Sequence, residues 1–293
     1  MYELIQAGPR SWYIESPAKI GLITAEDGNV WLVDAGGDKD AGRRVRKILD
    51  EKGWVCKGIL TTHSNADHIG GCRYLQQQYS CPVFAPGMER AFTQSPVLEP
   101  TLLYGGYPPS ELRHKFLMAQ GSDAVDLSDP RFPAEVEPIP LPGHFLDMVG
   151  YRAPDGVVFL ADCLSSETTL EKYQVSFIYD VAAYLDTLER VSRLEAPLFI
   201  PAHAAAAADI APLAEINRQK VWQIARLIQD ICRLPLPFES VLQELFTRLH
   251  LTMDFQQYAL VGSTIRSYLS WLKDGGHLTA CFQDNRLLWQ SID

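Results

Sequence analysis

The chain has 293 residues, of which 47% are hydrophobic, so it can bury one large α/β core with a small appendage and is not globally disordered. Its formal net charge is -10, which argues against a protein that grips a nucleic-acid backbone through a basic surface. The six cysteines form no CxxC pair, so we expect free thiols in a reducing compartment and a cytoplasmic location.

The first part of the chain predicts strands that alternate with two helices. The N-terminus has neither a basic start nor a long apolar run, so we expect no signal peptide, and no run of about 20 apolar residues predicts a membrane span. Periodic apolar residues predict a helix over 39–52, ended by Gly53, and another from Gly70 to about residue 79. Apolar runs bounded by turn residues predict strands at 11–14, 20–24, 30–34, 55–60 and 81–85.

The middle of the chain is less regular. Residues 87–132 hold several prolines and glycines and one predicted helix, over 110–119. A long stretch of this kind inside a compact domain is typical of a functional lid or an insertion. Regular elements then resume, with strands predicted at 135–139, 148–153, 156–162 and 198–201 and an amphipathic helix at 181–194.

The last part of the chain changes character near Asp209, which predicts a first domain at 1–209 and a second at 210–293. Helical patterns at 211–234, 238–249 and 254–272 precede a hairpin at 277–291, an order that resembles a small winged-helix unit. The third of these helices has only Arg266 as a basic residue, with Lys273 just beyond, which is too little charge to bind DNA. We expect this unit to pack against the active-site edge or to make homodimer contacts.

Metal-ligand residue types gather at the ends of predicted strands. The stretch His63-Ser64-Asn65-Ala66-Asp67-His68 lies between a strand and a helix, where α/β proteins often place their chemistry. Three later strand ends finish on His144, Asp162 and His203. A single histidine at a strand end is more often a hydrogen-bonded residue than a ligand, but the joint pattern favours a metal site. Imidazole with carboxylate suits zinc, iron or manganese, and this set is large enough for two ions.

With these residues the chain resembles the metallo-β-lactamase superfamily, whose motif is His-x-His-x-Asp-His followed by three single ligands. The resemblance covers residues 2–209 and implies an αβ/βα sandwich with metal at the strand-end edge. It implies that Asp67, His68 and His203 hold one ion, that His63 and His144 hold another, and that Asp162 bridges the two. Asp34, at the end of an early strand, matches the acidic residue that the family places beneath the metal loop.

One position departs from the motif, because Asn65 stands where the family has its second histidine. Its neutral amide oxygen is a poorer donor for zinc than imidazole and a better match for harder ions. We therefore expect one tight metal at Asp67, His68, Asp162 and His203. A second ion, at the site that contains Asn65, is expected to be weaker or not zinc.

The expected activity is metal-dependent hydrolysis of a small ester, thioester, lactone or related bond. A bound metal lowers the pKa of its water to about 7, and Asp67 is placed to orient the resulting hydroxide and take its proton. We expect a small-molecule substrate, with no nucleic acid and no membrane as partner. The alternatives are a phosphodiesterase or nuclease, which the acidic balance disfavours, and a non-catalytic binding module that kept the fold.

Overall fold

The structure is a computed structural model of the chain and describes residues 2–25 and 27–292. Its first sheet contains β1 (Glu3–Gln6), β2 (Ser11–Glu15), β3 (Ile20–Thr24), β4 (Asn29–Val33), β5 (Val55–Leu60), β6 (Val83–Phe84) and β7 (Ala124–Val125), side by side in chain order. Its second sheet contains β8 (Glu137–Pro140), β9 (Val149–Arg152), β10 (Val158–Ser165) and β11 (Phe199–His203), in the order β11-β10-β9-β8. Nine of these strands lie at predicted apolar runs, whereas β1 and β7 were not predicted.

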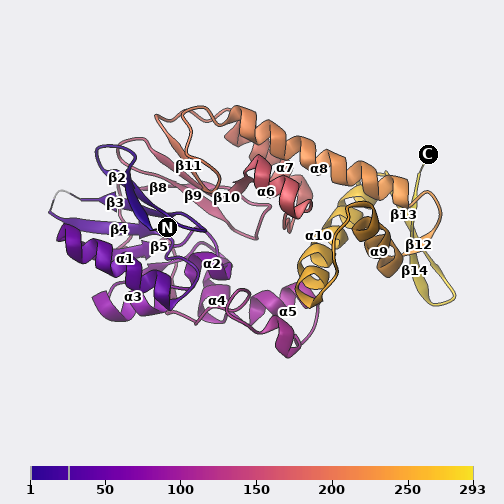
Figure 1. Ribbon diagram of the computed structural model, residues 1–293, viewed down its shortest axis with the longest axis horizontal. Helices are drawn as coiled ribbons and strands as arrows, with labels where there is room; N and C mark the ends of the chain where they lie inside the picture. Colours follow the sequence, from indigo (N-terminus) through magenta and orange to yellow (C-terminus); the bar gives the residue numbers. More distant parts are fainter. Residues whose placement is uncertain (1, 26, 293) are drawn as a thin grey trace.

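The two sheets pack face to face. Alternate residues of each strand point to opposite faces of its sheet, so one face packs on the other sheet and one on the outer helices. In β3, Ile23 joins a core cluster shared with the second sheet, while Leu22 packs toward the helices outside. In β10, Phe159 enters the same inter-sheet core and Leu160 faces outward. Figure 1 shows α1 (Lys39–Lys52) and α3 (Cys72–Tyr79) outside the first sheet, and α7 (Val181–Val191) and α8 (Ala211–Ile231) outside the second. The predicted αβ/βα sandwich is confirmed.

The helix expected from Gly70 forms as α3, and a short turn of helix that was not predicted precedes it. A short turn of helix, α2 (Ala66–Ile69), comes first, and α3 starts only after Gly71. Gly70 lies against the backbone of Gly37, where an added Cβ would stand 2.2 Å from the Gly37 carbonyl oxygen. The close approach requires glycine, and it packs α2 tightly against the loop that follows β4.

The predicted helix over 110–119 is wrong. Only a three-residue 3₁₀ turn forms there, η1 (Ser110–Leu112). Leu112 and Leu117 both belong to a small buried cluster with Ala259, and positions five apart on an α-helix would point about 140° from each other. The same region instead contains α4 (Glu89–Gln94) and α5 (Leu98–Tyr104), and α6 (Glu167–Tyr173) follows β10. None of these three helices was predicted.

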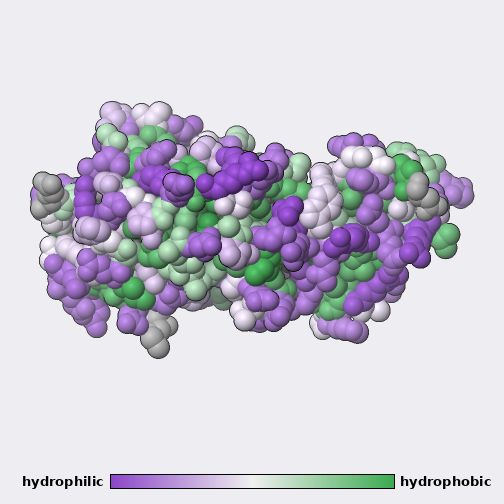
Figure 2. All heavy atoms as spheres, turned by 90° about the horizontal axis from the view of Figure 1, so that it is seen from above, coloured by the Kyte–Doolittle hydropathy of each residue, from purple (hydrophilic) through white to green (hydrophobic). Residues whose placement is uncertain are grey.

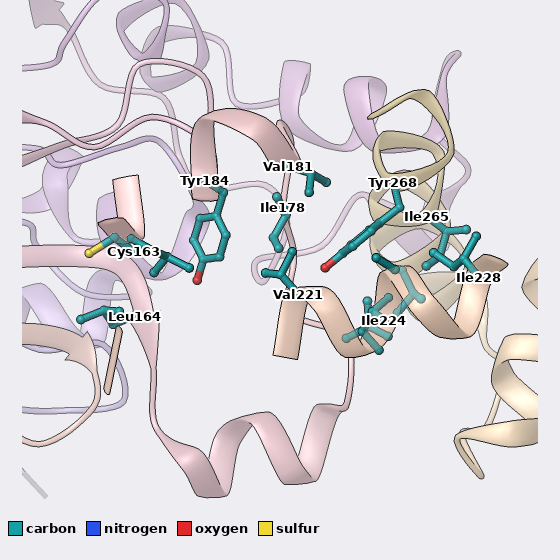
Figure 3. Close-up of a cluster of buried hydrophobic side chains, with 14 of the residues drawn as sticks. Cys163, Leu164, Ile178, Val181, Tyr184, Val221, Ile224, Ile228, Ile265 and Tyr268 are labelled. Carbon is teal, nitrogen blue, oxygen red and sulfur yellow. The ribbon is translucent and has the colours of Figure 1, made fainter. Parts of the chain in front are cut away.

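The C-terminal part has the predicted order of helices and hairpin, with one additional short strand. It contains α8, β12 (Leu236–Pro237), α9 (Phe238–Arg248), α10 (Phe255–Asp274), β13 (Leu278–Gln283) and β14 (Arg286–Ser291). One buried cluster runs from β10 and α7 through α8 into α9 and α10, and Figure 3 shows Tyr184 and Tyr268 at two points along it. The domain boundary and the winged-helix interpretation stay predictions.

The surface is mixed in character. Hydrophilic residues dominate the face in Figure 2, with hydrophobic ones gathered in smaller patches between them. Within residues 2–25 and 27–292, no helix combines the length and the apolar character needed to cross a bilayer.

Candidate metal centre

The turn after β5 delivers the first group of polar side chains. His63 follows the end of β5 and is fully buried, and α2 then carries Asp67 and His68. Because α2 is a single tight turn, these two residues are adjacent on a helix rather than on an extended loop. Asp67 remains partly exposed, whereas His68 is fully buried.

The second sheet delivers the other candidates from three places: the loop after β8, the interior of β10, which continues three residues beyond the strand end expected at Asp162, and the end of β11. His144 follows Gly143, which has a φ of 119°. A Cβ added to Gly143 would lie 2.3 Å from the backbone nitrogen of Tyr184, so only glycine fits at this position. Asp162 lies in β10 directly after Ala161, which has a φ of 51° and marks a shift in the pairing with β11. Such a bulge re-aims the next side chain, here toward the site. His203 is the last residue of β11.

Four of these residues form one compact group. Ligand atoms of Asp67, His68, Asp162 and His203 all lie within 4.8 Å of one another. His68 Nε2 is 3.0 Å from Asp162 Oδ1, and His203 Nε2 is 3.2 Å from Asp162 Oδ2 and 3.3 Å from Asp67 Oδ2. Atoms bound tetrahedrally at about 2.1 Å from one ion are about 3.4 Å apart, so the spacing fits a zinc-sized cation.

A second group shares Asp162. His63 Nε2 and His144 Nε2 lie 4.0 Å and 3.7 Å from Asp162 Oδ2, and the three ligand atoms are within 4.8 Å of one another. Asn65 Oδ1 lies 3.1 Å from His144 Nε2, so the amide faces the same space. All seven side chains that the sequence analysis singled out as ligands therefore meet at one edge of the sandwich.

Each imidazole is oriented by a partner at its other nitrogen. His68 Nδ1 lies 2.8 Å from Asp34 Oδ2. His63 Nδ1 donates to Thr62 Oγ1 at 3.0 Å. His144 Nδ1 donates to the Phe177 carbonyl at 3.0 Å, and His203 Nδ1 donates to the Pro17 carbonyl at 2.9 Å. Because a carbonyl only accepts, Nδ1 of His144 and His203 carries the hydrogen and Nε2 is left to face the site. This arrangement is common around metal-binding histidines.

Several polar atoms at the centre have no hydrogen-bond partner within the described part of the chain. They include His63 Nε2, His68 Nε2 and Asp162 Oδ1, all of them buried; the last two lie 3.0 Å apart but not in hydrogen-bonding geometry. Unpaired buried polar atoms cost free energy, and a bound cation would compensate this cost for all three. The donor set of this chain therefore fits a divalent metal.

The titration of these groups also suits a cation. Burial lowers the pKa of His63 and of His144, so both are neutral donors. The Asp162 carboxylate raises the pKa of His203 to about 10, against the effect of burial. Burial opposes ionisation of Asp162, but His203 and His68 outweigh it and hold the pKa of this carboxyl well below its usual range. Without a metal, the negative charge of the aspartates is balanced by protonated histidine, so binding of a cation releases protons from the centre.

Asp34 lies beneath the turn, where the family resemblance places it. It is buried, and its carboxylate accepts from Thr62 N at 2.7 Å and from Thr62 Oγ1 at 2.8 Å, besides contacting His68. Its φ of 65° lies in the left-handed region, which Asp tolerates better than most residues. Asp34 thus fixes the backbone of the turn and the ring of His68 together.

Two buried carboxylates that the sequence analysis missed support the same turn. Glu89 of α4 accepts from the backbone nitrogen and hydroxyl of Ser64 and from Asp147 N, and burial raises its pKa to about 7. Glu99 of α5 accepts from Asn65 Nδ2 at 2.8 Å. This contact turns the amide oxygen of Asn65 toward His144. The region 87–132 therefore supports the metal turn, and no local pattern marked either glutamate.

Two cavities flank the centre. One, of about 250 Å³, is lined by His144, Asp162 and residues of α6 and α10. The other, of about 230 Å³, is lined by Asp67 and by Lys115 and Phe116 of the 105–120 segment. Lys115 Nζ lies 3.1 Å from Asp38 Oδ2, and both residues line this second cavity. A substrate bond above the metal centre would have room for an arm on either side.

A face-to-face sandwich with histidines and aspartates gathered at one strand-end edge defines a class of metal-binding α/β proteins. The chain belongs to the metallo-beta-lactamase superfamily, whose family model matches residues 14–203.

Curated relatives and solved structures extend this result. The chain is 29% identical over 151 residues to a hydroxyacylglutathione hydrolase from Methylobacillus flagellatus, with 50% of each chain covered. It is 36% identical over 123 residues to one from Nitrobacter hamburgensis, covering 42% of this chain and 39% of that protein. The match thus spans half or less of these relatives' length.

Two solved structures share the fold along almost the whole chain. A metallo-beta-lactamase family protein from Thermus thermophilus has a TM-score of 0.71 at 16% identity, covering 100% of this chain and 98% of its own. A beta-lactamase domain protein from Burkholderia ambifaria has a TM-score of 0.71 at 16% identity, covering 99% and 94%. Both therefore include the C-terminal helices.

Proposed function

We propose that this chain is a metal-dependent hydrolase that cleaves a small thioester or related ester, with zinc as its principal metal and manganese or iron as alternatives. The observation that carries the proposal is the convergence of four imidazole Nε2 atoms and two aspartates at one edge, with buried atoms left unpaired. The curated relatives named hydroxyacylglutathione hydrolases support a thioester as the bond cleaved.

The protein's own residues supply positioning and proton transfer. A bound divalent ion would lower the pKa of a water molecule and stabilise negative charge on the carbonyl oxygen of the substrate. Asp67 is the acidic group of the centre with the greater exposure, and its Oδ2 lies 3.3 Å from His203 Nε2. It would hold the attacking water in line and accept its proton. Asp162 belongs to both groups and would fix their positions relative to each other.

Other functions are less well supported. A phosphodiesterase would benefit from cations around a charged substrate, yet Lys115 is the only Lys or Arg among the described residues that line the two flanking cavities. A non-catalytic module would not need the buried partners that orient every histidine of the centre. A cytoplasmic location is part of the proposal and is supported by the six free cysteines, five of them buried. Homodimer formation stays a prediction.

The purified chain tests the proposal directly. After loading with zinc, manganese or ferrous iron, it is assayed against matched thioester, ester, lactone and phosphodiester substrates. The expected result is thioester hydrolysis that a chelator abolishes and that the same metal restores. Absence of turnover with all three metals would contradict an enzymatic function and favour the binding module.

The metal content should reflect the unusual Asn65. We expect one tightly held zinc per chain after dialysis, at Asp67, His68, Asp162 and His203, because an amide oxygen is a weaker zinc donor than imidazole. Asn65→His should raise the tightly held zinc to about two equivalents by supplying the missing imidazole. The measurement is elemental analysis after dialysis, with Asn285→His in the distant C-terminal hairpin as control. Two tight equivalents in the natural chain would contradict a weakened first site.

A further inference from the structure

The cavity on the α10 side reaches the metal centre from the C-terminal part of the chain. His144 and Asp162 line it together with Gln256, Gln257 and Leu260 of α10. A group bound here is therefore in contact with residues of the metal centre. Figure 1 shows α10 beside α5, and η1 also contacts α10, so the 87–132 region supports this helix.

The lining of this cavity is uncharged apart from the metal centre itself. No Lys or Arg lines it, and Asp162 is its only carboxylate, as judged from residues 2–25 and 27–292. Lys172, whose Nζ lies 3.2 Å from the Tyr173 hydroxyl, is outside the lining. Away from the metal centre, an anionic group placed here would find no cationic side chain in the lining to replace its hydration, which is costly.

The cavity nevertheless offers unused hydrogen-bonding groups. The side-chain amides of Gln256 and Gln257 make no hydrogen bond to any described residue of the chain, although Gln257 N is bound to the Asp254 cap. Phe177 and Leu260 supply apolar surface in the same lining. An arm with an amide and a short aliphatic portion would satisfy both kinds of surface. The volume of about 250 Å³ is close to the lower limit of about 300 Å³ for small-molecule pockets, so the arm is short.

We propose that this cavity binds an uncharged, amide-bearing arm of the substrate and that Gln257 is a determinant of this specificity. The proposal rests on the proposed thioester hydrolysis and adds the chemistry of one arm. The curated relatives are named for glutathione, a thiol that carries two carboxylates. The α10 cavity of this chain provides no Lys or Arg for such a group among the described residues that line it, so its own substrate differs at this arm.

Two pairs of thioesters test the proposal with the metal-loaded full chain. The first pair varies the thiol, with butyryl thioesters of N-acetylcysteamine and of 3-mercaptopropionate. The second varies the acyl group, with succinamoyl and succinyl thioesters of N-acetylcysteamine, which differ only in a terminal amide against a carboxylate. Thiol release gives kcat/KM. In at least one pair the neutral compound should be preferred by about tenfold or more, and that pair identifies which arm occupies the cavity.

Charge-changing substitutions of Gln257 provide a second test. Gln257→Arg should reduce the preference in that pair by about tenfold, and Gln257→Glu should increase it, because each places a full charge beside the bound arm. Gln243→Arg, at an exposed position of α9, is the matched control and should leave the ratio unchanged. Equal rates within both pairs, or a ratio that Gln257→Arg leaves unaltered, would overturn the subsite while leaving thioester hydrolysis intact. A lack of turnover with every compound would instead refute the proposed function.

Discussion

Replacing Asp162 by alanine is expected to lower kcat/KM for a thioester by about a thousandfold or more, which corresponds to about 4 kcal/mol of transition-state stabilisation. Asp162 belongs to both groups of candidate ligands and lies 3.0 Å from His68 Nε2 and 3.2 Å from His203 Nε2. Its removal leaves both sites without a shared anion, so the affinity for metal should fall together with the activity. Steady-state kinetics and elemental analysis of the same preparation measure both effects.

The matched control is Asp186→Ala, which removes an exposed aspartate from α7 on the outside of the second sheet. It should retain the metal content and activity of the natural chain. Circular dichroism separates a loss of metal from a loss of folding. If Asp162→Ala retained full activity and metal content, the assignment of this residue as the bridge would have to be abandoned.

Replacing Asp34 by alanine is expected to affect stability and metal binding together. The substitution leaves Thr62 N and the Thr62 hydroxyl without their buried acceptor and His68 Nδ1 without its partner. Each unsatisfied buried group costs about 1–3 kcal/mol, and alanine tolerates the φ of 65° less well than aspartate. Loss of a histidine's orienting partner typically weakens metal affinity by about 10- to 100-fold.

The free energy of unfolding of the metal-free protein and a competitive zinc titration measure the two effects separately. Asp34→Asn is the useful comparison, because it keeps the shape and one acceptor oxygen and should give an intermediate loss in both. A variant Asp34→Ala with unchanged stability and unchanged zinc affinity would show that the turn is held by other contacts.

The strands and the longer helices could be predicted because their signals are local. In α1, Asp38 caps the first turn and Gly53 ends the helix in a left-handed conformation, which are residue types that recur at those positions. In β10, an uninterrupted apolar run follows a turn at Asp155 and Gly156, and the strand is buried along most of its length. Local propensity and final burial agree in both elements.

The region 87–132 could not be predicted for the opposite reason. Glu89 and Glu99 are buried carboxylates whose partners, Ser64 and Asn65, lie 25 and 34 residues away in the chain. Leu112 and Leu117 are buried by Ala259 of α10, more than a hundred residues further along. Helix periodicity carries no information on such distant contacts, so the wrong helix over 110–119 and the missed α4 and α5 have one cause.

The sequence by itself determined the kinds of ligand available, because histidine, aspartate and a single asparagine at strand ends are chemical identities that no fold can change. Only the tertiary structure decided how they meet. The ring of His203 is oriented by the carbonyl of Pro17, 186 residues away, and the amide of Asn65 by Glu99. The α10 cavity likewise depends on a helix from the far end of the chain. Orientation and pocket shape arise from long-range packing, which one-dimensional patterns do not record.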